Sequence, residues 1–149
     1  MTEPASLVRY ARHVDATRGW IGRSIERGRG GSCAHFSPMT GWSRPYPETT
    51  GYLIPTLLAL GDREPAIAVG RWLLSIQNAD GSWNGGLHPP KKPARPSVFN
   101  TGQILDGMIA LNRGNAGPEY IDAAHRGARW LAAGMGADGL WRGGDYRAS

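Results

Sequence analysis

The sequence predicts an all-α protein built from repeated pairs of helices, and two observations lead to this fold class. Residues 66–86 recur as residues 124–144, with an Arg-Trp-Leu and an Ala-Asp-Gly-x-Trp segment kept in both copies. Residues 50–60 recur as residues 101–111, with a Thr-Gly and an Ala-Leu dipeptide kept. Because the two kinds of segment alternate along the chain and both have helical periodicity, each repeat unit consists of two helices.

The first expected element is an N-terminal helical segment over residues 7–26, which carries a stripe of apolar residues at helical spacing. A weak third copy of the repeat begins here, at Trp20, and places Cys33 where Trp83 stands in the next unit. The pattern leaves open whether the segment forms one helix or two.

The first helix of each complete unit is apolar on nearly all of its faces and is expected over residues 50–60 and 101–111. Such a helix is buried on most sides. Thr49 or Thr50 and Asn100 are the expected N-caps, since their side-chain oxygens can accept hydrogen bonds from unpaired amides of the first turn. We therefore expect these two helices on the inside of the array.

The second helix of each unit is amphipathic and is expected over residues 65–77 and 118–135. In the first of these, Val69, Trp72 and Ile76 fall on a single stripe. A proline stands at the start of both, where no amide donor is needed. These helices are expected on the outside, with one face packed on the inner helices.

An Asp-Gly-x-Trp turn follows each outer helix, at residues 80–83 and 138–141. The aspartate can accept hydrogen bonds from amides of its own turn, the glycine can adopt a positive φ, and the tryptophan can fold back between neighbouring helix pairs. We interpret the repeated tryptophans as packing residues. Trp72 and Trp130 should occupy equivalent, buried positions.

Two motifs resemble families of helical repeat proteins. The string Gly70-x-Trp72-Leu73-x-x-x-Gln77-x-x-x-Gly81-Ser82-Trp83 resembles the QW motif of terpene cyclases and prenyltransferases, from which the second copy departs at Met135 and Leu140. The string Tyr46-Pro47-Glu48-Thr49-Thr50-Gly51-Tyr52 and the segment from Ser97 to Leu105 resemble a family of bacterial toroid proteins associated with exopolysaccharide biosynthesis. Both resemblances imply an α/α toroid, in which inner helices surround a cavity and outer helices enclose them.

The sequence predicts a single domain over residues 1–149, with repeat units over about 15–48, 49–99 and 100–149. A closed toroid of about six helix pairs needs roughly 300 residues at this repeat length. We therefore expect a partial ring. Its end faces would be covered by a second copy of the chain in a homo-oligomer or by the remainder of a longer protein.

Composition argues against several classes of protein. The chain is 40% hydrophobic and 19% charged, with no apolar run long enough to cross a membrane and no signal-peptide pattern, so we expect a cytoplasmic protein. Cys33 is the single cysteine and does not combine with the histidines at metal-ligand spacing, so we predict no metal and no cofactor. The net charge of +5 is scattered rather than gathered into an aromatic-interleaved patch, which argues against nucleic-acid binding.

The candidate site lies in the loops that lead into the inner helices, because these loops line the mouth of a toroid cavity. Glu48 and Tyr46 are the candidate catalytic residues, since a carboxylate and a phenol can transfer protons. The candidate substrate-binding residues are Trp42, Arg44, Asn100, Gln103 and Asp106. Asp106 stands out because a carboxylate within an otherwise apolar inner helix requires a partner if it is buried. Structural roles remain open for Glu48, as a first-turn carboxylate, and for Asn100, as a cap.

These residues and resemblances lead to three hypotheses of function. The first is a carbohydrate-active enzyme or glycan-binding protein of exopolysaccharide biosynthesis, with a saccharide or sugar-polymer ligand at the mouth of the toroid. The second is an isoprenoid enzyme of terpene cyclase or prenyltransferase type, although the Asp-x-Asp-Asp acid motif and an aspartate-rich diphosphate site are absent from the sequence. The third is a non-catalytic helical scaffold.

Overall fold

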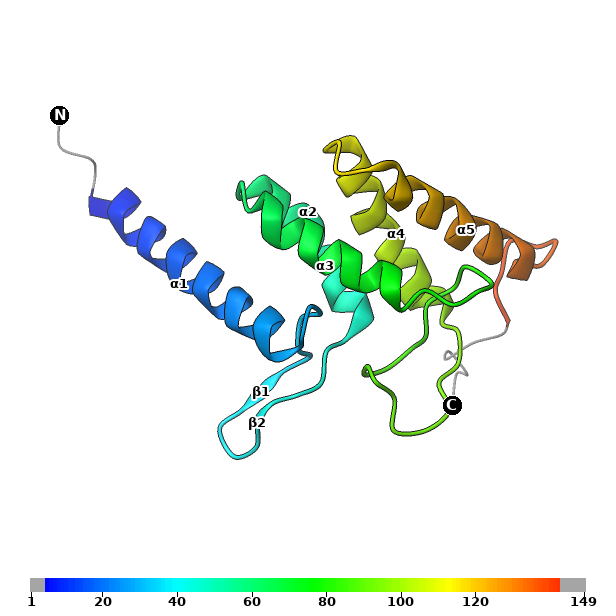
Figure 1. The fold of residues 1–149 in the computed structure, drawn as a ribbon, viewed down its shortest axis with the longest axis horizontal. Coiled ribbons are helices and arrows are strands. Elements are labelled where there is room, and N and C mark those ends of the chain that lie inside the picture. The colour runs from blue at the N-terminus through cyan, green and yellow to red at the C-terminus, as the bar shows by residue number, and fades with distance from the viewer. Residues whose placement is uncertain (1–4, 143–149) are drawn as a thin grey trace.

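The computed structural model describes residues 5–142 and confirms the all-α fold class. Its helices are α1 (Ala5–Arg27), α2 (Pro47–Ala59), α3 (Arg63–Ser75), α4 (Val98–Arg113) and α5 (Pro118–Gly134) (Figure 1). A small antiparallel ribbon of β1 (Phe36–Ser37) and β2 (Gly41–Trp42) lies in the loop between α1 and α2. The last residues of the second repeat segment, 143 and 144, lie outside the described part of the chain.

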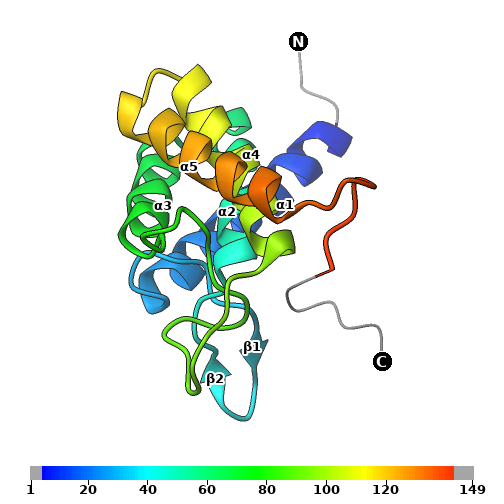
Figure 2. The same ribbon diagram turned by 90° about the vertical axis from the view of Figure 1, so that its right-hand side faces the viewer.

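The helices alternate between inner and outer positions. The inner helices α2 and α4 pack along each other, α3 packs mainly on α2, and α5 packs mainly on α4 (Figures 1 and 2). The N-terminal segment is a single helix, α1, which leads into α2 and therefore takes an outer position. Within residues 5–142 no inner helix precedes α1. Tyr10 and Val14, which belong to the predicted apolar stripe of this segment, are 67% and 41% exposed.

The inner helices approach each other through glycines. A Cβ atom on Gly51 of α2 would lie 2.7 Å from the Cα atom of Ile104, and a Cβ atom on Gly107 of α4 would lie 2.4 Å from the carbonyl oxygen of Gly51. Both distances are shorter than van der Waals contact permits, so only glycine fits at either position. Around this contact lies one buried cluster that includes Ile54, Leu57, Leu73, Trp83, Met108, Leu111 and Tyr120.

Both inner helices begin earlier than predicted, at Pro47 and Val98, and the predicted N-caps are wrong. Ser97 is the N-cap of α4, and its hydroxyl accepts a hydrogen bond from the amide of Asn100 at 3.2 Å. Tyr46 is at the N-cap position of α2 and has no side-chain cap bond. The earlier start of α2 is possible because proline fits the first helical turn without an amide donor.

Two buried threonines one turn into the inner helices have a different function from capping. The Thr50 hydroxyl accepts a hydrogen bond from the amide of Ser32 at 2.9 Å. The Thr101 hydroxyl accepts one from the amide of Trp83 at 3.0 Å. Each threonine therefore ties the turn after an outer helix to the following inner helix.

The turns after α3 and α5 repeat their hydrogen bonds. The indole N–H of Trp83 donates to the carbonyl of Leu73 at 2.8 Å, and that of Trp141 donates to the carbonyl of Leu131 at 2.8 Å. Asp80 and Asp138 each accept a bond from the amide two residues ahead, as predicted. Trp83 is fully buried, whereas Trp141 is 43% exposed.

The glutamine of the QW motif joins neighbouring units. The side-chain amide of Gln77 donates to the carbonyl of Gly81 at 2.9 Å and to that of Ala123 on α5 at 3.0 Å. The same amide group therefore holds the turn after α3 and the next outer helix together. Its counterpart in the second unit, Met135, cannot make these bonds and is 45% exposed.

Trp72 and Trp130 occupy equivalent positions, but they are only partly buried, which corrects the prediction. Trp72 lies over the turn of the preceding unit, where a Cβ atom on Gly31 would approach its ring to 2.6 Å. Trp130 lies near the Asp80 carboxylate in the corresponding turn. Each ring therefore links an outer helix to the turn after the previous outer helix.

The first repeat unit aligns differently from the prediction. Backbone bridges join Cys33 to Pro45 and, at the same repeat positions, Asn84 to Pro96. Cys33 therefore corresponds to Asn84, one residue after Trp83, and the position of Trp83 is occupied by Ser32. The Gly-Gly-Ser-Cys string has no tryptophan to set the alignment, which explains the error.

Replacing Gly107 with alanine should destabilise the protein by about 1–3 kcal/mol, because the added methyl group forces α2 and α4 apart. Gly102 lies in the same helix, and a Cβ atom there would have no other atom within 4 Å, so Gly102→Ala is the matched control. That variant should be neutral or stabilising by up to about 1 kcal/mol. Urea denaturation of both variants measures the difference, and equal stabilities would contradict the glycine contact.

Candidate functional site

The seven predicted site residues are distributed over three places rather than gathered into one site. Glu48, Gln103 and Asp106 lie on the inner helices α2 and α4. Asn100 lies in the buried first turn of α4. The side chains of the remaining three line pockets formed by the loops; these are Trp42, Arg44 and Tyr46.

The inner helices share a face that α3 and α5 do not cover, the open face, and at its edge Tyr52 also lines a pocket with residues of α1. Tyr52 follows Glu48 by one turn on α2, and the Tyr52 ring is 45% exposed. On α4 the stripe contains Phe99, which is 40% exposed, then Gln103 and the exposed Asp106. Asp106 is exposed, so its carboxylate needs no buried partner.

Asn100 has a structural role in this region. It is 3% exposed, and its side-chain amide donates to the carbonyl of Asn84 at 3.1 Å. Its side-chain oxygen lies 3.3 Å from the hydroxyl of Ser97. The side chain therefore fixes the loop between α3 and α4 to the start of α4.

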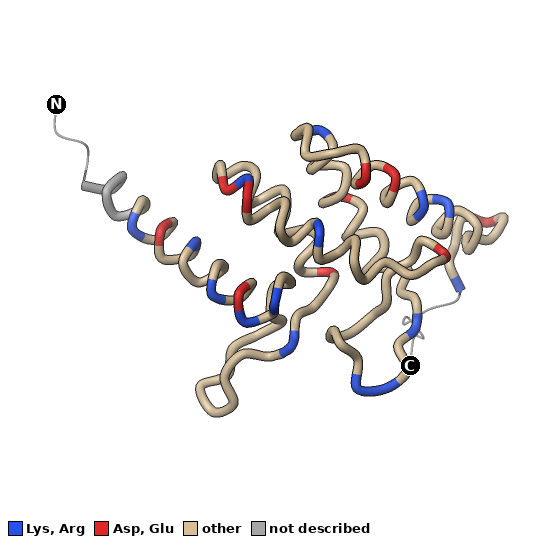
Figure 3. Tube along the Cα trace, in the orientation of Figure 1, with Lys and Arg blue, Asp and Glu red and all other residues tan. Residues whose placement is uncertain are grey.

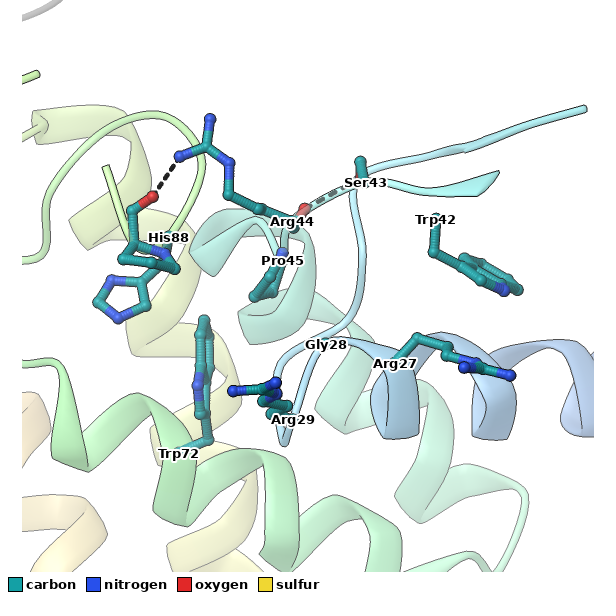
Figure 4. A pocket seen from close by; sticks show the side chains of 10 residues that line it. Arg27, Gly28, Arg29, Trp42, Ser43, Arg44, Pro45, Trp72 and His88 are labelled. Carbon is teal, nitrogen blue, oxygen red and sulfur yellow. Dashed lines mark hydrogen bonds between the residues drawn. The ribbon is translucent and has the colours of Figure 1, made fainter. Parts of the chain in front are cut away.

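A pocket of about 550 Å³ lies where the turn after α1, the loop before α2 and the loop before α4 meet α3 (Figure 4). We call it the arginine pocket. Its lining side chains are those of Arg27, Arg29, Trp42, Ser43, Arg44, Pro45, Trp72, His88 and Pro89. The sequence analysis missed Arg27, Arg29 and His88, since they belong to separate segments and form no motif.

Main-chain contacts hold the two loops of the arginine pocket together. The Arg44 guanidinium donates to the carbonyl of Pro89, as Figure 4 shows, and the His88 amide donates to the carbonyl of Pro45 at 2.8 Å. The His88 ring packs edge-on against Trp72, with ring centroids 5.5 Å apart. Burial lowers the pKa of His88, because desolvation disfavours the charged imidazolium.

Trp42 also belongs to an aromatic cluster beside the arginine pocket. Its ring centroid is 4.6 Å from that of Trp20 and 5.2 Å from that of Phe36. The Arg23 guanidinium lies 5.9 Å from the centroid of the Trp20 ring, within cation–π distance. The Trp42 indole therefore stabilises the contact between the β1–β2 ribbon and α1.

Tyr46 and Arg44 line another pocket, of about 660 Å³, together with the basic loop before α4. This loop contributes Lys91, Lys92 and Arg95, and Figure 3 shows its basic residues on the side of the molecule where the loop projects. Tyr46 is thereby separated from Glu48, although the two are close in sequence: its side chain belongs to the loop pocket, and Glu48 belongs to the first turn of α2.

Within residues 5–142, no group of three or more His, Cys, Asp or Glu side chains is placed to hold a metal ion. Over the same residues, no helix combines the length and the apolar character needed to cross a membrane.

The chain is similar to labda-7,13-dienyl diphosphate synthase of Streptomyces clavuligerus, with 32% identity over 100 residues. The matched region is 67% of this chain and 15% of that protein, so the chain corresponds to a small part of its relative. No known protein-family profile matches the chain, and no solved structure matches it. The relative supports the resemblance to terpene cyclases and offers no support for a link to exopolysaccharides.

Acidification should destabilise the protein through His88. Its pKa is lower in the folded than in the unfolded chain, so the unfolded state binds a proton first as the pH falls below about 6.5, and stability decreases there. His88→Gln removes this contribution and should flatten the stability profile between about pH 7 and pH 5.5. Denaturant titrations across this range measure it, with His125→Gln on the exposed face of α5 as control. Parallel profiles for His88→Gln and the unchanged protein would contradict the assignment.

Proposed function

We propose that this chain forms part of the wall of an isoprenoid-binding cavity in an enzyme of terpene cyclase type. The observation that carries the proposal is its similarity to labda-7,13-dienyl diphosphate synthase. The alternating inner and outer helices and the QW-type turns support it, because they build an array whose inner helices share one open face. A cavity lined by that face is the natural place for a substrate.

The composition of the open face suits a prenyl chain. Tyr52 and Phe99 lie on neighbouring inner helices, and both rings are partly exposed. Aromatic rings bury large apolar areas of a hydrocarbon ligand. Their faces also attract positive charge, which would stabilise a carbocation formed along the chain.

Two carboxylates accompany the rings on this face. Glu48 stands in the first turn of α2, and Asp106 is exposed two turns into α4. The sequence contains no Asp-x-Asp-Asp acid motif, so we assign to this chain the binding of the hydrocarbon rather than its initial protonation. In this proposal Glu48 and Asp106 stabilise positive charge in the bound substrate, and Gln103 lies between Phe99 and Asp106 along α4.

The isoprenoid proposal replaces the saccharide hypothesis as the one with more support. Two of the residues predicted to bind a sugar do not accompany Glu48 on the open face: Trp42 packs in the aromatic cluster and Arg44 reaches to the loop before α4. Their placement therefore does not support a single saccharide site that combines these groups at the mouth of a toroid.

A prenyl alcohol such as farnesol tests the proposal without a contribution from a diphosphate. Tyr52→Ala and Phe99→Ala should each weaken farnesol binding about three- to tenfold, because each removes an aromatic contact. Met39→Ala is the control, since Met39 is 91% exposed on the turn of the β1–β2 ribbon. Isothermal titration calorimetry measures all three variants.

Two outcomes would overturn the proposal. One is farnesol binding that Tyr52→Ala and Phe99→Ala leave unchanged. The other is tight binding of a uronate oligosaccharide that Tyr52→Ala abolishes, which would return the open face to the saccharide hypothesis.

A further inference from the structure

The net positive charge of the chain lies in two loops. The first, residues 28–46, joins α1 to α2, and the second, residues 81–97, leads into α4. These loops contain no aspartate or glutamate, and the rest of the chain carries equal numbers of acids and bases. The loops therefore account for the whole net charge of +5. The bases responsible are Arg29, Arg44, Lys91, Lys92 and Arg95.

The two loops project from the same side of the helices. In Figures 1 and 2 the β1–β2 ribbon of the first loop and the basic stretch of the second both extend beyond the helices in the same direction. Arg44 of the first loop lines a pocket together with all three bases of the second. Its guanidinium donates to the carbonyl of Pro89, which joins the loops. A flat surface can therefore contact both loops at once.

The β1–β2 ribbon differs in composition from the loop beside it. Residues 30–43 contain no Lys, Arg, Asp or Glu, and the ribbon accordingly carries no charged residue in Figure 3. Its turn nevertheless exposes apolar side chains. Met39 is 91% exposed, and Phe36 beside it is 43% exposed. Single exposed apolar residues are common on protein surfaces, but here they gather with the exposed Pro38 on one projecting element that carries no charge.

The turn of the ribbon leaves no main-chain donor free. Pro38 has no amide hydrogen, and the amides of Met39 and Thr40 both donate to the hydroxyl of Ser37, at 3.2 and 3.4 Å. A loop that enters the interfacial region of a bilayer loses water from its amides, which is costly when nothing replaces that water. The Ser37 hydroxyl reduces this cost, because it already satisfies both amides.

Aromatic rings support the ribbon from behind. The rings of Trp20, Phe36 and Trp42 form one cluster, with centroids 4.6, 5.2 and 5.6 Å apart, and this cluster holds the ribbon against α1. Trp20 is itself 45% exposed. Tryptophan is favoured at the boundary between lipid and water, because its ring is apolar and its N–H is polar.

We propose that this face of the protein binds the surface of a lipid bilayer that contains anionic lipids. The side chains of Pro38 and Met39 enter the interfacial region, and those of Lys91 and Lys92 contact the anionic headgroups. Insertion of apolar side chains and attraction of bases to anionic lipid are the two contributions that hold peripheral proteins on membranes.

The two features together favour a lipid surface over a soluble polyanion. A nucleic acid attracts bases through its phosphates, but the exposed Met39 on a turn without charge adds nothing to such binding. A bilayer uses both the bases and the apolar turn. The inference does not depend on the function proposed for the open face, because neither the ribbon nor the basic loop belongs to α2 or α4.

Co-sedimentation with vesicles tests the charged part of the face. The protein should bind phosphatidylcholine vesicles that contain about 30% phosphatidylglycerol at least tenfold more tightly than pure phosphatidylcholine vesicles. The double variant Lys91→Gln, Lys92→Gln should weaken binding to the anionic vesicles about tenfold, because two bases near the surface are lost. The matched control is Arg12→Gln, Arg113→Gln, which removes the same charge from exposed positions outside both loops and should have less than about a twofold effect.

Met39→Ser tests the apolar part of the face. It should weaken binding to the anionic vesicles about three- to tenfold, because a large apolar side chain no longer enters the bilayer. The melting temperature should not change, since the side chain is 91% exposed. Met135→Ser is the matched control: it makes the same substitution at a 45% exposed methionine after α5, outside both loops, and should leave binding unchanged.

Several results would overturn the proposal. One is equal affinity for vesicles with and without anionic lipid, and another is an equal loss in a control variant. Binding of single-stranded RNA without binding of vesicles, weakened by Lys91→Gln, Lys92→Gln and unchanged by Met39→Ser, would assign the face to nucleic acid instead. Farnesol binding reports only on the open face and should not change in the lysine variant, so failure of one proposal is distinguishable from failure of the other.

Discussion

The close contact between α2 and α4 sets the positions of the other elements. With Gly51 and Gly107 at the contact, no side chain separates the two backbones, and the helices lie as near as their main chains allow. This fixes which stripe of each inner helix is buried and which stays open. The outer helices cover one side of the inner pair. Each loop from an outer helix leads to the start of an inner helix, and the starts of α2 and α4 lie close together. The arginine pocket forms where these loops meet.

The sequence predicted the helices and turns well because these depend on local signals that occur twice. The Asp-Gly-x-Trp turn follows its predicted hydrogen bonds in both copies, at Asp80 and at Asp138. The errors arose where a local pattern does not determine the environment. Asp106 lies in a helix that was expected to be buried on most sides, and the apolar residues around it did not determine which side it occupies. The face on which it lies is open, because burial depends on which helices surround that face.

The site was predicted only in part for a similar reason. Glu48, Gln103 and Asp106 share a face because helical spacing places them there. Arg29 and His88 come from distant segments, and their proximity results from the end of α1 lying beside Trp72 on α3. One signal was present in the sequence: an arginine stands where the other turns of the repeat carry aspartate. This signal appears only when Cys33 of the first unit is aligned with Asn84, as the backbone bridges require, and not with Trp83, as predicted.

The backbone bridges beside each inner helix have a consequence for how such a protein can change during evolution. Cys33 with Pro45, and Asn84 with Pro96, close the two loops at their base. The segments between these pairs have the same length and almost no sequence in common, because one contains an aromatic ribbon and the other a proline-rich basic stretch. A closed base fixes both ends of the loop beside its inner helix, so mutations between the bridged residues can change the loop surface without moving those ends. Gene duplication followed by divergence of these loops would then yield new binding surfaces on an unchanged helical array.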